Sequence, residues 1–179
     1  MEPSSNHFKL FGLEIGFDID EQLLAQRYRE LQRTAHPDRY VSATDRERRL
    51  AVQRAAEIND AFQILREPLS RARYLLELNG VGWDAERNTA TDPAFLMEQM
   101  ELRETLHEAR AAREPLPSID RLLADISERV GGAMAELREL FAAEAPDFER
   151  IKVNIDKQQF LRRLQRQAEE LEEELLGAA

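Results

Sequence analysis

Residues 20–66 read DEQLLAQRYRELQRTAHPDRYVSATDRERRLAVQRAAEINDAFQILR, two helical patterns with a short polar segment between them. In the first pattern, apolar side chains recur at helical spacing: Leu24, Tyr28, Leu31 and Ala35. Pro37 ends this helix, because the residue before a proline is pushed out of the α-helical region. A second helix is predicted from about Asp45 to Arg66, where Pro68 closes it. The stretch therefore predicts a helical hairpin that carries the tripeptide His36-Pro37-Asp38 in its loop.

The remainder of the chain also shows helical patterns. Asp18 and Glu21 form a possible capping box, which would start the first hairpin helix near residue 19. A short amphipathic helix is predicted over 69–78 and stops at Asn79-Gly80. Longer helices are predicted from Asp92-Pro93 to about residue 113, from Ser118 to about residue 143, and from Pro146-Asp147 to about residue 176. Gly131-Gly132 should interrupt the second of these and weaken or kink it.

The composition supports an all-α protein of two parts. The 179 residues are 42% hydrophobic and 34% charged, with only seven Gly and seven Pro. We expect an N-terminal domain over residues 1–79, a connection over 80–91, and an antiparallel three-helix bundle over 92–179.

Charge and cysteine content exclude several classes of function. The net charge of −10 argues against general nucleic-acid binding, which needs a basic surface. Residues 1–78 carry 12 basic and 13 acidic side chains, whereas residues 79–179 carry 13 and 22, so the two parts should address different partners. The chain has no cysteine, hence no disulfide and no thiolate metal site. Without a bilayer-length apolar run or a signal or transit segment, a cytoplasmic location with no membrane partner is predicted.

The histidines do not predict an enzyme. His36 and Asp38 have no third partner for a catalytic or metal site, and His7 and His107 lie far away in sequence. We therefore expect no catalytic residues, no metal and no cofactor.

The hairpin with its His-Pro-Asp loop resembles the J-domain, the module that stimulates ATP hydrolysis by DnaK-type chaperones. The resemblance implies that His36, Pro37 and Asp38 contact the chaperone, together with Arg27, Arg29 and Arg33 on the preceding helix. A positive helix face would steer such an encounter electrostatically. The alternative is that the loop is an ordinary turn and that the arginines merely solvate the helix.

A second group of residues lies on the first helix of the predicted bundle. At about 100° per residue, one face of this helix holds the core candidates Phe95, Gln99, Leu102, Leu106 and Ala109. Met97, Met100 and Glu104 fall on the opposite side, with Glu101 and Glu108 beside them and Leu96 at the flank. This pattern predicts an exposed docking patch, because methionine adapts to partner surfaces. The alternative is that another part of the chain, such as the N-terminal domain, covers this face.

The whole chain resembles the HscB family, bacterial J-type co-chaperones of iron–sulfur cluster assembly. The resemblance rests on Phe95-Leu96-Met97-Glu98-Gln99-Met100-Glu101-Leu102-Arg103-Glu104, on Arg73-Tyr74-Leu75-Leu76, and on Phe160-Leu161 with Leu171-Glu172-Glu173. It implies that the bundle binds an IscU-type scaffold protein. The implied contact residues are Leu96, Met97, Met100, Glu101, Glu104 and Glu108, with Phe160 from the last helix. Phe160 also lies beside the core row of its helix, so packing explains it equally well.

The resemblance implies a noncatalytic adaptor that delivers the scaffold to a DnaK/HscA-type chaperone and stimulates the chaperone's ATPase. The paired CxxC motifs and transit peptide of eukaryotic relatives are missing, which favours the bacterial type. One alternative is a general J-protein that delivers unfolded clients, although residues 80–91 are not Gly/Phe-rich and zinc-binding cysteines are lacking. A purely structural helical adaptor is the other.

Overall fold

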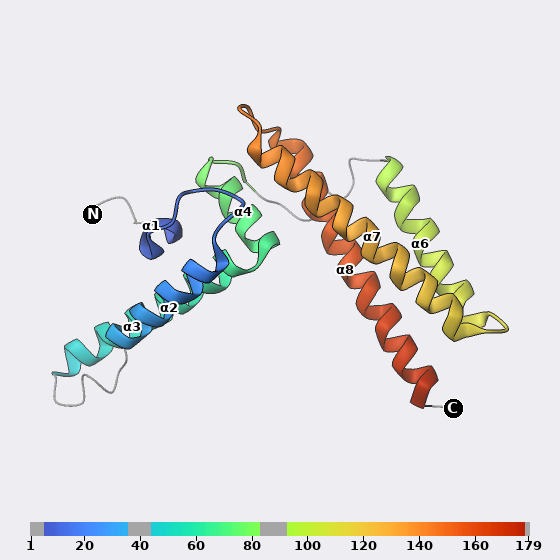
Figure 1. The fold of residues 1–179 in the computed structure, drawn as a ribbon, viewed down its shortest axis with the longest axis horizontal. Helices are drawn as coiled ribbons and strands as arrows, with labels where there is room; N and C mark the ends of the chain where they lie inside the picture. The colour runs from blue at the N-terminus through green and yellow to red at the C-terminus, as the bar shows by residue number, and fades with distance from the viewer. Residues whose placement is uncertain (1–5, 36–43, 83–92, 178–179) are drawn as a thin grey trace. The chain divides into compact units, whose positions relative to one another are not determined.

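The computed structural model describes residues 6–35, 44–82 and 93–177. These residues contain α-helices and no strands, which confirms the all-α prediction (Figure 1). They form two compact units that divide between Val81 and Gly82. Most of the expected connection at 80–91 lies outside the described residues.

The first unit is built on the predicted hairpin. Its helices are α1 (His7–Phe11), α2 (Glu21–Ala35), α3 (Asp45–Arg66) and α4 (Pro68–Leu78). α2 and α3 lie side by side, and both α1 and α4 pack against α3 (Figure 1). The α3 bounds agree with the prediction because both ends carry strong local signals. Thr44 and Glu47 form a reciprocal capping box at the start, and Pro68 begins the next helix.

The start of α2 differs from the prediction. Asp20, not Asp18, caps the helix, since its carboxylate accepts the Leu23 backbone N–H at 2.9 Å. An aromatic cluster then fixes the rotation of α2. The Tyr28 ring stacks on Phe62 of α3 at 4.0 Å, and Phe11 of α1 meets the edge of Phe62 at 6.5 Å. With Tyr28 and the fully buried Leu24 facing inward, Arg29 and Arg33 are left on the exposed side of the helix.

The second unit is a bundle of α6 (Pro93–Ala111), α7 (Pro115–Ala142) and α8 (Phe148–Gly177). Consecutive helices run antiparallel and all three pairs are in contact (Figure 1). Their buried side chains form one hydrophobic core: Phe95, Leu102, Ala109, Ile119, Leu122, Ile126, Phe160, Leu161, Leu164, Ala168 and Leu171.

Two predictions about α7 were wrong. The helix begins at Pro115 rather than being capped by Ser118, whose hydroxyl lies inside the helix and donates to the Glu114 carbonyl at 3.1 Å. Prolines are tolerated there because N–H groups of the first turn have no intrahelical acceptor. The helix also continues through Gly131-Gly132 without interruption. Buried Ala133 and Leu137 beyond the glycines hold it against the core, which outweighs the poor helix propensity of glycine.

Candidate functional site

α6 presents the two faces that its sequence predicts. Phe95, Leu102 and Ala109 are buried in the bundle core, and Gln99 and Leu106 are half-buried beside them. Leu96, Met97 and Met100 are 41%, 63% and 70% exposed. No described helix of the bundle covers these three side chains. The predicted exposure of the methionines is therefore confirmed within the bundle.

Three carboxylates share this exposed side of α6. Glu101, Glu104 and Glu108 are all exposed, and none of them forms an ion pair with a described residue. We define the docking face as Leu96, Met97, Met100, Glu101, Glu104 and Glu108. Exposed apolar side chains bordered on one side by these carboxylates can bind a partner surface that carries an apolar patch with basic side chains at its edge.

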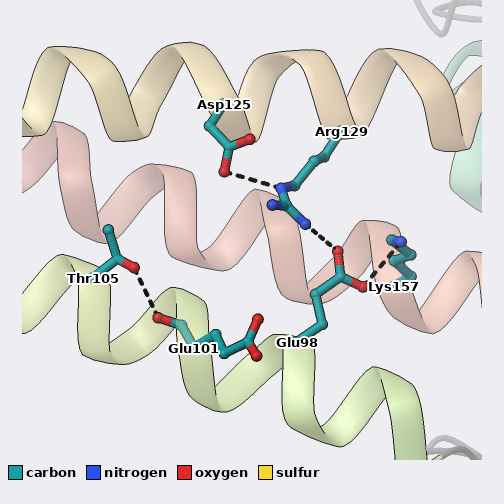
Figure 2. A network of polar contacts seen from close by, with 6 residues as sticks. All are labelled: Glu98, Glu101, Thr105, Asp125, Arg129 and Lys157. Carbon is teal, nitrogen blue, oxygen red and sulfur yellow. Dashed lines mark hydrogen bonds and ion pairs between the residues drawn. The ribbon is translucent and has the colours of Figure 1, made fainter.

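Glu98 follows Met97 directly but faces another side of α6, and both of its carboxylate oxygens are paired. Its carboxylate accepts from Arg129 of α7 at 2.6 Å and from Lys157 of α8 at 3.0 Å, as Figure 2 shows. Arg129 also pairs with Asp125 at 3.0 Å. The network joins all three helices, so it fixes how α6 is rotated in the bundle. That rotation turns the docking face outward.

The same contacts hold Glu98 in its ionised form. Burial opposes ionisation, but the hydrogen bonds and charges of Lys157 and Arg129 outweigh it and lower the pKa of the Glu98 carboxyl below its ordinary value. A lowered pKa in the folded state means that ionised Glu98 contributes stability above the unfolded pKa, about 4.3. That contribution is lost as the pH falls through the lowered folded value.

We expect Glu98→Gln to lower the free energy of unfolding at pH 7 by about 1 kcal/mol, because the neutral amide keeps the shape but loses the charge. The difference from wild type should shrink as the pH falls below about 4, where the wild-type carboxyl is also neutralised. Urea unfolding followed by circular dichroism between pH 7 and pH 3 measures it.

Glu101→Gln is the matched control, because that carboxylate has no cationic partner among the described residues and its loss should not lower stability. Equal loss of stability in both variants, or a Glu98→Gln effect that does not vary with pH, would contradict the assignment of the network.

Phe160 does not belong to the docking face. Its ring is only 4% exposed and lies in the hydrophobic core, where it meets the edge of Phe95 with ring centroids 6.0 Å apart. The prediction that Phe160 is itself a scaffold-binding side chain is thus not supported, because a buried ring offers little surface to a partner. The core row of α8 explains its position.

The second candidate surface lies on α2 of the first unit. Arg27, Arg29 and Arg33 are exposed along this helix, and Arg27 forms an ion pair with Glu30 at 3.2 Å. Both side chains of that pair are about half exposed, so the ion pair contributes little to stability. Arg27 can therefore exchange Glu30 for a carboxylate of a partner at little cost. His36, Pro37 and Asp38 follow the end of α2 directly but lie outside the described residues.

Sequence reasoning missed the Glu98 network. The residue lies at the border of the core face of α6, and its partners stand 31 and 59 positions further along the chain. No local spacing rule connects them. The only sequence signal was that Glu98, unlike Glu101 and Glu104, falls next to the core row.

Within the described residues, none of the helices combines the length and apolarity needed to cross a membrane.

Known proteins resemble this chain over nearly its whole length. A family model described as the HSCB C-terminal oligomerisation domain matches residues 91–169. The co-chaperone protein HscB homolog of Vibrio cholerae is 41% identical over 179 residues, which cover 96% of this chain and 99% of that protein.

Two solved structures resemble this chain closely. The structure of chaperone HscB from Vibrio cholerae is 38% identical and superposes with a TM-score of 0.84, covering 95% of this chain and 99% of the other. The crystal structure of the human co-chaperone protein HscB also reaches a TM-score of 0.84, at 27% identity, over 94% of this chain and 83% of the human one.

Proposed function

The chain belongs to the HscB family of co-chaperones, and on this basis we propose that it couples an iron–sulfur scaffold protein to a DnaK-type ATPase. It binds an IscU-type scaffold through the docking face of α6 and delivers it to an HscA-type chaperone. His36-Pro37-Asp38 and the α2 arginines engage the chaperone and stimulate ATP hydrolysis. The cluster and its ligands belong to the scaffold, since this chain has no cysteine.

The observation that carries the proposal is the docking face itself. Two methionines more than 60% exposed lie together with exposed Leu96 on one side of α6, and three carboxylates that have no ion pair among the described residues border them. Such a surface fits a folded partner with an apolar centre and a basic rim. The arginines of α2 provide charge of the opposite sign on the other unit, which suits a second, acidic partner.

Holding both partners on one molecule raises the local concentration of scaffold at the chaperone. Nothing in this arrangement requires the chain to perform chemistry. The general J-protein alternative needs a broad apolar surface that accepts many unfolded clients. The docking face is a single helix side with a defined charge pattern, which favours one folded partner instead.

The experiment that tests the proposal is affinity capture from a bacterial extract with the full chain immobilised. We expect two proteins to dominate: a cysteine-containing cluster scaffold, and one DnaK-type chaperone that is released by high salt. Capture of a broad set of unfolded proteins, with no enriched scaffold, would favour the general J-protein instead. A chain carrying Met97→Ala and Met100→Ala serves as the control and should capture the chaperone alone.

Self-association is a second use that the docking face permits. The matched family model is described as an oligomerisation domain, and an exposed apolar helix face can bind a second copy of itself. Light scattering of the full chain at increasing concentration measures this directly. A dimer that dissociates when scaffold is added would place both contacts on the same face.

A further inference from the structure

The charges on α6 are sorted by sign around the helix. Glu101, Glu104 and Glu108 stand on one side of Met100, and Arg103, His107 and Arg110 stand on the other, with Leu96 between. Opposite charges three or four residues apart form ion pairs on other helices, as in Arg27–Glu30, Asp125–Arg129 and Glu149–Lys152. On α6 the same spacings join like charges, Glu101 with Glu104 and Glu104 with Glu108. The sorting gives the exposed apolar side of α6 one negative flank and one positive flank.

Among the described residues, Arg103 is the arginine of this flank that forms no ion pair. Arg110 forms an ion pair with Glu174 of α8 at 3.8 Å. Arg103 pairs with no carboxylate among the described residues and instead lies over the ring of Phe160, with its guanidinium carbon 5.5 Å from the ring centroid. A guanidinium that stacks on an aromatic face keeps its N–H donors free at the edge.

Phe160 is well suited to hold that guanidinium in one place. The ring is locked by the hydrophobic core and by its edge-to-face contact with Phe95. It comes from α8, so the contact carries the side chain of Arg103 across the α6–α8 boundary. There the two helices form a shallow groove of about 310 Å³ with Leu106 and Leu171 in its lining. The fixed cation thus stands at the lip of a groove beside Leu96 and Met100.

We propose that Arg103, held in place by Phe160, is a specificity-determining residue of the docking face and binds a carboxylate of the scaffold protein next to the apolar patch that covers Leu96 and Met100. This rests on the proposed function, since the partner is the same scaffold. It gives Phe160 a positioning role that does not require its buried ring to touch the partner. It also predicts a scaffold surface with basic side chains on one side of its apolar patch and an acidic one on the other.

The charge arrangement would set the orientation of the scaffold. A partner rotated by half a turn on the docking face would place its basic side chains against Arg103 and its acid against Glu104 and Glu108. Both contacts would then be repulsive. A single arginine can exclude this wrong orientation more effectively than it adds affinity.

The test measures binding of a purified IscU-type scaffold to the full chain by calorimetry, together with thermal unfolding of every variant. We expect Arg103→Gln to weaken binding roughly 5-fold and Arg103→Glu roughly 20-fold or more, with unfolding unchanged. Arg138→Gln changes an exposed arginine near the C-terminal end of α7, is the matched control and should bind as wild type.

A double-variant cycle separates the positioning role from direct contact. Phe160→Leu should weaken binding about 3-fold, and Phe160→Leu with Arg103→Gln should bind no more weakly than Arg103→Gln alone. If the loss of affinity in the double variant equals the product of the two single losses, Phe160 acts independently of Arg103 and its positioning role is overturned. If Phe160→Leu unfolds the bundle, Arg103→Glu carries the test, because one Asp or Glu→Lys change in the scaffold should restore its binding.

The outcomes distinguish this inference from its premise. Wild-type affinity in Arg103→Gln and Arg103→Glu, with wild type itself binding scaffold, would overturn the inference and leave the proposed function intact. A wild-type chain that binds no scaffold would overturn both.

Discussion

His36→Gln is expected to abolish stimulation of the DnaK-type ATPase while scaffold binding stays at the wild-type level. Loss of stimulation returns the chaperone to its basal rate of ATP hydrolysis, and we expect an effect on the order of 10-fold. The physical reason is that proline fixes one backbone torsion of the loop and thereby limits where its neighbours can point. The proposed contact needs the imidazole of His36 as well as the carboxylate of Asp38, and glutamine supplies no imidazole.

Steady-state ATP hydrolysis by the chaperone, titrated with the full chain in the absence of scaffold, measures the effect. His107→Gln is the matched control, because it removes an exposed imidazole from the other unit and should stimulate normally. The concentration of chain needed for half-maximal stimulation should rise with ionic strength. Salt screens the attraction between the chaperone and the exposed side chains of Arg27, Arg29 and Arg33. Undiminished stimulation by His36→Gln would rule out the role of the loop.

The second large effect is expected for Met97→Ala combined with Met100→Ala, which should weaken scaffold binding roughly 10- to 100-fold. Each methionine is more than 60% exposed, so truncation leaves no cavity and stability should remain unchanged. On binding, the same side chains lose that exposed surface to the partner, and their truncation removes buried apolar area from the complex. Calorimetric titration with purified scaffold measures the affinity, and thermal unfolding checks the fold.

Leu176→Ala provides a matched control for this pair. Leu176 is a 60% exposed apolar side chain near the end of α8, away from the docking face along the sequence, and its removal should not alter affinity. Unchanged affinity in the double methionine variant would show that the docking face does not bind the scaffold. If light scattering shows that the double methionine variant has a lower molecular mass in solution than wild type, while its affinity for scaffold is unchanged, the docking face serves self-association instead.

The two predictions are separable, and that separation tests the adaptor mechanism. The loop variant should bind scaffold but fail to stimulate, and the methionine variant should stimulate alone but fail to couple scaffold to the chaperone. A mixture of the two variants should not restore coupling, because tethering requires both surfaces on one molecule.

The sequence by itself determined the all-α fold and the two faces of α6. Both follow from the 3.6-residue period, which is a property of one helix and needs no knowledge of its neighbours. The bounds of α3 could be predicted for a similar reason, since Thr44, Glu47 and Pro68 act within one turn. Local signals misled where several competed, as at Asp18 and Asp20, or where tertiary packing outweighed propensity, as at Gly131-Gly132.

Only the tertiary structure decided what depends on contacts between helices. It placed Phe160 in the core and Arg103 over its ring, and it paired Glu98 with Arg129 and Lys157. These partners are separated by 31 to 59 positions, and their meeting depends on how three helices are rotated against one another. Glu98 and Glu101 stand one helical turn apart, yet Glu98 joins the three helices of the bundle whereas Glu101 is exposed on the docking face. The difference lies in which cations the packing of the helices brings within reach of each carboxylate.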